Sequence, residues 1–181
     1  MANPDRRTRR LAACGLLAAL SVALMMTSLL PFGVYCAAIL ATLPLIPAQD
    51  AWGSRWALAV YAAAAVLGLL LSPDRETALV FLAFGYYPAL REKLQAIPSA
   101  ALRLLGKLVL CNAGIGAVWA ASVWIFLLPA EELAGSAVLG ALLVVLGNLT
   151  FLLYDLALAR LTALYRKRWR RLLRRWLGAE P

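Results

Sequence analysis

Long apolar runs separated by short charged segments occupy most of this chain, and they constrain its fold more than any other feature. The runs cover residues 11–30, 33–47, 56–72, 77–90, 104–128 and 134–159. A soluble domain of 181 residues has too little interior to cover them, because 64% of the residues are hydrophobic, against roughly 45–50% in ordinary soluble domains. We therefore expect lipid to be the solvent around these runs.

The runs are expected to be helices, which gives an all-α fold. No run alternates polar and apolar residues as a membrane β-strand must, and in lipid a helix satisfies its own backbone groups. The runs 33–47 and 77–90 are short, since about fifteen helical residues reach only about 22 Å of a bilayer core of about 30 Å. A six-helix transmembrane bundle is the preferred interpretation. Four complete spans plus two half spans or re-entrant segments are the alternative.

The distribution of basic residues favours six spans. If the N-terminus is cytoplasmic, Arg75 is the one basic residue of 18 that falls in an outer loop. Cytoplasmic loops of membrane proteins carry an excess of Lys and Arg. The pattern predicts a multi-pass protein of a bacterial-type plasma membrane with both termini in the cytoplasm.

The first apolar run follows several arginines and is similar at its start to an export signal. The apolar core of a signal peptide has about 7–15 residues, whereas this run has about 20. We therefore expect residues 11–30 to be a retained membrane helix that ends at Pro31.

The tail, residues 160–177, reads RLTALYRKRWRRLLRRWL, with apolar residues at helical spacing on one face and arginines on the other. Such a helix is expected to lie in the headgroup region as an interfacial anchor that contacts membrane lipids. A docking surface for a cytoplasmic partner is the alternative. Nucleic acid is not an expected partner, because the tail emerges at the bilayer.

The sequence contains no pattern that predicts catalysis, a cofactor or a metal site. Histidine is absent, and no GxxxxGK[ST] loop or GxSxG motif occurs. The three cysteines are isolated within apolar runs. A membrane enzyme that uses Asp74, Glu76 or Glu131 is the least favoured interpretation, because no spacing supports a metal or a nucleophile.

The predicted spans carry no charge at mid-depth, and few polar groups lie within them. Ion-coupled transporters keep ionisable groups there, so a self-sufficient transporter is not expected. Asn112 and Asn148 are expected to hydrogen-bond between helices. An outward-facing cavity that uses Tyr35, Trp119, Ser122 and Trp124 is one way to hold a flat organic ligand. The alternative is that these residues pack within the protein or lie at the membrane interface.

Small residues recur on one face of the first predicted helix, at Ala12, Gly15, Ala19 and Ala23. Steps of three and four residues place them in one ridge, which lets another helix approach closely. Packing within this chain and docking of a partner both remain open from the pattern alone.

The chain resembles the substrate-binding S components of energy-coupling factor (ECF) transporters in three features. These are the basic N-terminus, the LLAALSVAL helix with its small-residue ridge, and six predicted spans in a short chain. The resemblance implies that Gly15, Ala19 and Ala23 dock a transmembrane coupling subunit, which ATPases drive. It also implies that a small solute, of vitamin or precursor type, binds from outside. No stretch resembles the ligand motifs of the thiamin, riboflavin, biotin or cobalt members.

Two further segments, FGYYPALREKL (84–94) and FLLYDLALARL (151–161), are similar to motifs of uncharacterised S-component-like membrane proteins. Both place aromatic and polar residues at the predicted inner interface. Arg91 and Asp155 are expected to form a pair there or to belong to a partner surface. The predicted function is thus an S-component-like uptake subunit, with a non-transporting membrane scaffold that binds a partner through its inner basic face as the alternative.

Overall fold

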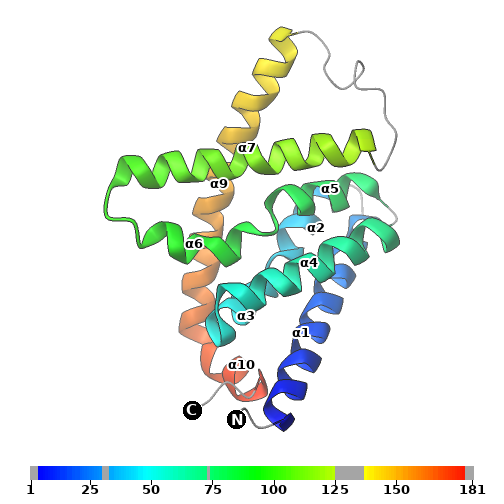
Figure 1. The fold of residues 1–181 in the computed structure, drawn as a ribbon, viewed down its shortest axis with the longest axis vertical. Coiled ribbons are helices and arrows are strands. Elements are labelled where there is room, and N and C mark those ends of the chain that lie inside the picture. Colours follow the sequence, from blue (N-terminus) through cyan, green and yellow to red (C-terminus); the bar gives the residue numbers. More distant parts are fainter. Residues whose placement is uncertain (1–3, 30–32, 73, 125–136, 178–181) are drawn as a thin grey trace.

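The computed structural model describes residues 4–29, 33–72, 74–124 and 137–177, and every regular element in these ranges is a helix (Figure 1). The elements are α1 (Pro4–Met25), η1 (Met26–Leu29), α2 (Gly33–Ala41), α3 (Leu45–Trp52), α4 (Ser54–Leu71), α5 (Arg75–Phe84), α6 (Tyr87–Gln95), α7 (Ala100–Trp124), α9 (Ala137–Arg168) and α10 (Arg170–Leu177). The all-α class is confirmed.

Four helical segments in the described part of the chain are long and apolar enough to cross a membrane. They are Arg7–Ser28, Ser54–Leu71, Ala100–Trp124 and Gly140–Arg168. A helical membrane protein is therefore supported. The count of six complete spans is not confirmed, because the predicted spans 33–47 and 77–90 each coincide with parts of two short helices.

The second predicted span breaks between α2 and α3, where Pro44 cannot donate a backbone hydrogen bond. Thr42 Oγ1 donates to the Ile39 carbonyl at 2.7 Å, and the Leu45 and Ile46 amides bond three residues back. The chain therefore passes through a tight turn before α3 begins. Pro47 lies in the first turn of α3, where proline is tolerated.

The fourth predicted span breaks at Gly85 and Tyr86, which join α5 to α6. Pro88 is the second residue of α6, so its missing N–H removes no bond from that helix. The new helix runs to Gln95 and buries its first turn. Arg91 therefore lies on a packed helix instead of in a loop.

The helices enclose two apolar clusters of different character. The cluster of α1 to α4 is rich in alanine and contains Leu17, Met25 and Val60. The second cluster lies around α9 and is aromatic, with Tyr87, Phe151 and Tyr154 in mutual ring contact. In Figure 1, α7 runs across α9 where the two helices meet.

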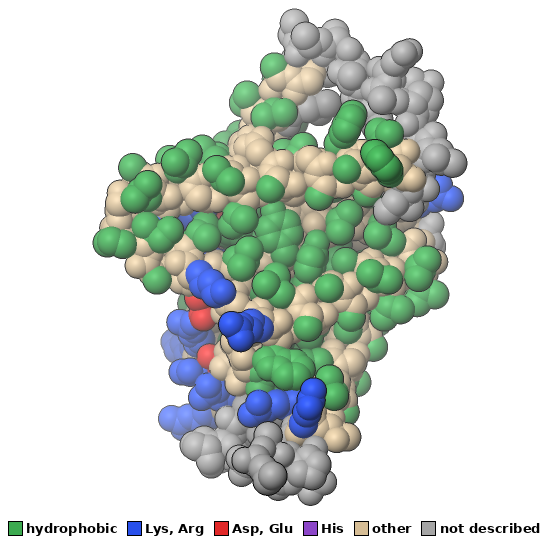
Figure 2. All heavy atoms as spheres, in the orientation of Figure 1, with side chains coloured by type: hydrophobic (Ala, Val, Ile, Leu, Met, Phe, Trp, Pro, Cys, Tyr) green, Lys and Arg blue, Asp and Glu red, His purple; other side chains and the backbone are tan. Residues whose placement is uncertain are grey.

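On the face shown in Figure 2, apolar side chains are spread over much of the surface and basic side chains gather at one end. Large aliphatic side chains are exposed on the four long helices, among them Leu16, Leu70, Val109 and Val145. Basic side chains gather near α10, the end at which α1 also begins. A bilayer accounts for both features, since its core covers the aliphatic surface and its headgroups meet the basic end.

Candidate functional site

One carboxylate, that of Asp155 on α9, connects three helices. Its Oδ1 accepts hydrogen bonds from the Tyr87 hydroxyl at 2.7 Å and from Arg91 Nε at 2.8 Å, both on α6. Its Oδ2 accepts from Lys107 Nζ on α7 at 2.6 Å. We call these four residues the Asp155 cluster.

The spacing of α6 brings the cluster together. Tyr87 and Arg91 are four residues apart and so share a face of the helix. Tyr87 is fully buried, and its ring meets Phe151 edge-on with the centroids 4.6 Å apart. When the Gln95 amide is oriented with its oxygen toward Arg91, that oxygen accepts a hydrogen bond from Arg91 Nη2 at 2.7 Å. The orientation of Arg91 is thus set from two sides.

The Asp155 cluster has one anion and two cations, all largely removed from solvent. The side chains of Arg91 and Lys107 are 11% and 20% exposed, and that of Asp155 is 13% exposed. Both oxygens of Asp155 accept hydrogen bonds, so the carboxylate links α6 and α7 to α9. The expected Arg91–Asp155 pair is present, whereas a role for it in partner binding stays a prediction.

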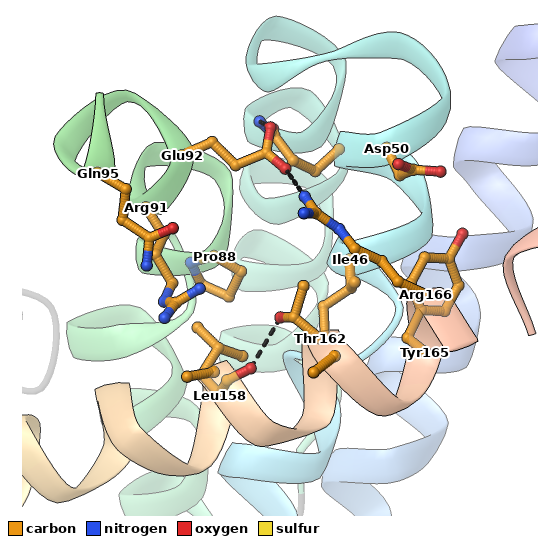
Figure 3. A pocket seen from close by; sticks show the side chains of 13 residues that line it. Ile46, Asp50, Pro88, Arg91, Glu92, Gln95, Leu158, Thr162, Tyr165 and Arg166 are labelled. Atoms are coloured by element: carbon orange, nitrogen blue, oxygen red, sulfur yellow. Dashed lines mark hydrogen bonds and ion pairs between the residues drawn. The ribbon is translucent and has the colours of Figure 1, made fainter. Parts of the chain in front are cut away.

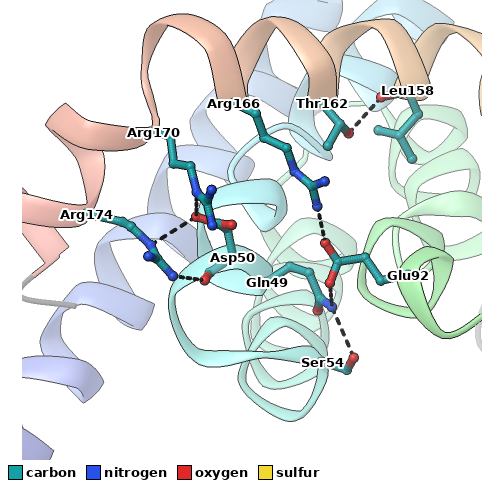
Figure 4. A network of polar contacts seen from close by, with 9 residues as sticks. All are labelled: Gln49, Asp50, Ser54, Glu92, Leu158, Thr162, Arg166, Arg170 and Arg174. Atoms are coloured by element: carbon teal, nitrogen blue, oxygen red, sulfur yellow. Dashed lines mark hydrogen bonds and ion pairs between the residues drawn. The ribbon is translucent and has the colours of Figure 1, made fainter. Parts of the chain in front are cut away.

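A second set of ion pairs attaches the C-terminal tail to the inner helices (Figure 4). Arg166 on α9 bonds Glu92 on α6 at 2.6 Å, and Arg170 and Arg174 on α10 approach Asp50 on α3 at 3.1 and 3.2 Å. The three arginines recur at four-residue spacing and therefore form one stripe. We call these five residues the tail cluster.

The tail cluster changes the interpretation of residues 160–177. They were predicted to form one interfacial helix, and the structure divides them between the end of α9 and α10, which packs against α3 and α9. The stripe at 166, 170 and 174 faces acidic residues of this same chain. Lys167, Arg168 and Arg171 are exposed and remain available to lipid headgroups.

A cavity of about 270 Å³ lies beside the tail cluster, between α3, α6 and α9 (Figure 3). We call it the polar cavity, because Gln49, Asp50, Arg91, Glu92, Tyr165 and Arg166 contribute to its wall. A second cavity, of about 290 Å³, lies between α2, α5 and α9. It is lined mainly by apolar side chains, with Thr42, Thr150 and Tyr154 as its polar groups, and we call it the apolar cavity.

The predicted ligand residues on α7 lie away from both cavities. Trp119 and Trp124 are exposed on α7, Trp124 to 81%, whereas Ser122 is buried. None of the three lines the polar or the apolar cavity. Tyr35 lies in α2, but its side chain is outside the described residues. Their role in binding a ligand stays a prediction.

The predicted docking residues Gly15, Ala19 and Ala23 are exposed on one face of α1. A Cβ added to Gly15 meets no atom within 4 Å. The opposite face of α1 is buried, with Leu17, Ala18, Ser21, Val22 and Met25 in the interior. The described part of this chain therefore does not use the ridge for internal packing.

The expected bond between polar residues of two long helices is present. Asn112 Nδ2 on α7 donates to Asn148 Oδ1 on α9 at 3.3 Å. Each amide also donates to a carbonyl of its own helix four residues back. Such a pair adds a directional contact where α7 crosses α9.

Comparison with known proteins identifies no relative of the chain. No protein-family model matches it, and searches of curated proteins and of solved structures find no match. The fold and its surface define the class, a helical membrane protein with a charged end.

Proposed function

We propose that this chain is a membrane subunit of the S-component type, which binds a small solute of vitamin or precursor type from outside. A partner module with a transmembrane coupling subunit and ATPases would power the uptake. The proposal includes a bacterial plasma membrane with both termini in the cytoplasm. The observation that carries it is the exposed small-residue ridge of α1.

The ridge supports a helix partner because of what surrounds it. Leu16 and Leu20 are exposed one helical turn apart along one flank of the ridge, while the buried face of α1 already contacts α2 and α4. A face that meets only lipid tails gains nothing from small residues. Small residues let two helix backbones approach closely, and the van der Waals packing that results is one of the contributions that drive helix association in membranes.

The apolar cavity supports a small and largely apolar solute. Its volume of about 290 Å³ is at the low end of the roughly 300–1,000 Å³ that ligand sites occupy. The Tyr154 hydroxyl donates to Thr42 Oγ1 at 3.1 Å, so both hydroxyls are near the wall of this cavity. They would orient a solute that carries one or two polar groups.

Co-purification with the coupling subunit and ATPases of an ECF module tests the proposal. We expect the wild-type chain to retain these subunits in detergent and Ala19→Trp to lose them, because an indole prevents close approach at the ridge. Ala63→Trp is the matched control, since Ala63 is exposed on α4 outside the ridge. Equal retention by both variants would reject docking through α1.

The alternative is a membrane scaffold without a solute, and the exposed basic residues Lys167, Arg168 and Arg171 favour it. In that case, a cytoplasmic partner would be lost when these three residues are changed to Glu. The same partner would be retained by Ala19→Trp. The two variants therefore separate the two proposals.

A further inference from the structure

The Asp155 cluster contains more positive than negative charge. Arg91 and Lys107 both bond the single carboxylate of Asp155, and the remaining member, Tyr87, is neutral. Both cationic side chains are largely removed from solvent, so water screens the excess charge poorly. Charges taken out of water in proteins are normally paired. A second anion beside this cluster would therefore be favourable.

A third cavity, of about 470 Å³, borders the cluster where the end of α6 faces the start of α7. It is lined by Gln95, Ala100, Arg103, Leu104 and Lys107, and no acidic residue is among these described lining residues. We call it the basic cavity, because its two charged residues are cations. Arg103 and Lys107 are four residues apart and so share one face of α7.

Arg103 adds a second positive charge to this wall without a counter-charge. It forms no ion pair with any residue that the structure describes, whereas Lys107 shares its one carboxylate with Arg91. Like charges four residues apart on a helix repel each other and destabilise it. An anion that contacts both side chains would replace this repulsion with two attractions.

The remaining walls of the basic cavity are polar on one side and aliphatic on the other. Gln95 lies next to Arg91 on α6 and connects this cavity to the Asp155 cluster (Figure 3). Leu104 lines the cavity and is 47% exposed, and its neighbour Leu105 is exposed as well. The arrangement fits an anionic group whose attached carbon chain continues along the apolar surface of α7.

We propose that the basic cavity binds a phosphate group through Arg103 and Lys107. A guanidinium can donate to two phosphate oxygens, and the Lys107 ammonium has N–H donors beyond the one that Asp155 accepts. Two sources carry this chemistry, the headgroup of an anionic phospholipid and free glycerol phosphate. Basic pockets between membrane helices are known to bind lipid headgroups. The site is independent of docking at the α1 ridge, so failure of one proposal leaves the other standing.

Native mass spectrometry of the full chain in detergent tests this site with three amphiphiles that carry the same acyl chains. Phosphatidylglycerol is expected to be retained at a concentration about tenfold lower than phosphatidylcholine. Both headgroups contain a phosphate, but phosphatidylcholine adds a quaternary ammonium, which the two cations repel. The free fatty acid tests whether a carboxylate suffices, and retention as tight as that of phosphatidylglycerol would overturn the assignment of a phosphate.

Two variants locate the binding, and a third serves as the control. Lys107→Met and Arg103→Gln should each reduce the preference for phosphatidylglycerol to about twofold. Arg103 has no ion pair in the described structure, so its variant covers the case in which Lys107→Met does not fold. Arg55→Gln removes the same charge from an exposed position on α4 and should leave the preference unchanged. An equal loss in Arg55→Gln and Arg103→Gln would show that total charge holds the lipid and would overturn the proposal.

Free glycerol phosphate distinguishes the two sources. If millimolar glycerol phosphate displaces phosphatidylglycerol, the phosphate and glycerol alone supply the binding, which supports a soluble phosphate ester as occupant. If it does not, the acyl chains are also required, which supports the lipid. Equal retention of phosphatidylglycerol and phosphatidylcholine by the wild-type chain, or an unchanged preference in folded Arg103→Gln, would show that the basic cavity does not bind a phosphate group.

Discussion

The Asp155 cluster and the tail cluster use the same chemistry in different surroundings. In both, a carboxylate meets more than one cationic or polar donor across helices distant in sequence. The clusters differ in their cations, which are 11% and 20% exposed in the Asp155 cluster and 35–51% exposed in the tail cluster, whereas Asp155 and Asp50 are both buried, at 13% and 9%. Solvent screens exposed pairs and makes them weak, but a buried pair cannot lose one member without leaving an unbalanced charge. The buried cluster should therefore hold the fold, and the exposed one should position the tail.

The largest effect is expected for Asp155→Ala, which leaves Arg91 and Lys107 buried without a counter-charge. Removing one partner of a buried ion pair costs about 3–5 kcal/mol of unfolding free energy. Unfolding of the purified protein in detergent, followed by circular dichroism, measures the loss. Because the cost comes from the stranded cations, Asp155→Leu combined with Arg91→Met and Lys107→Met should recover most of it. If the Asp155→Ala variant were as stable as the wild type, the two clusters would not differ in their contribution to stability.

A smaller effect is expected for Tyr87→Phe, which removes the hydroxyl bond to Asp155 and keeps the ring contact with Phe151. A hydrogen bond to a charged group contributes about 2 kcal/mol. Tyr154→Phe is the matched control, because its hydroxyl bonds the neutral Thr42, and should cost about 1 kcal/mol by the same unfolding measurement. A larger loss for Tyr154→Phe than for Tyr87→Phe would indicate that charge is not what makes the Asp155 cluster strong.

In the tail cluster, Asp50→Asn should release α10 at a cost of about 1 kcal/mol or less, because the two arginines left without a carboxylate are 45% and 35% exposed and can be solvated, although Asp50 itself is 9% exposed. Hydrogen exchange of the α10 amides is the measurement, since Arg170 and Arg174 both lose their carboxylate. We expect faster exchange in α10 and unchanged exchange in α4. Added salt should speed exchange of α10 in the wild type and have little further effect in the variant. Protection of α10 that is insensitive to both changes would show that apolar packing alone holds the tail.

The sequence predicts some features of this molecule well and others not at all. Apolar runs indicate the all-α class and the long helices, because a span needs only length and composition. The proximity of Arg91 and Asp155 follows from two segments with aromatic and polar residues at one interface. Lys107 lies within α7 and completes the buried cluster. The sequence around this lysine does not show that a helix begins at Ala100 and turns its side chain inward.

The breaks within the second and fourth predicted spans, and the partners of the tail, depend on tertiary structure. Pro44 and Gly85 were visible in the sequence, but hydropathy treats each run as one helix. The spacing of Arg166, Arg170 and Arg174 was also visible as a stripe. The acid that meets each arginine was not, because the residues lie 74 positions apart for Glu92–Arg166 and 120 for Asp50–Arg170. The contact of α6 with α9 and the packing of α10 against α3 select these pairs.

The smallest effect on the unfolding free energy is expected for Arg166→Gln. This variant therefore tests most directly whether the two clusters differ because one is buried and the other is exposed. Its side chain is 51% exposed and that of Glu92 is 45% exposed, so the pair should contribute about 0–1 kcal/mol. Glu92 also keeps its bond from Gln49 Nε2, which leaves the carboxylate partnered after the substitution. The difference from wild type in detergent unfolding should vanish in high salt, because screening already removes most of the attraction. A loss equal to that of Tyr87→Phe would mean that the polar cavity shields Glu92 and Arg166 from solvent, and that the two clusters belong to one buried network.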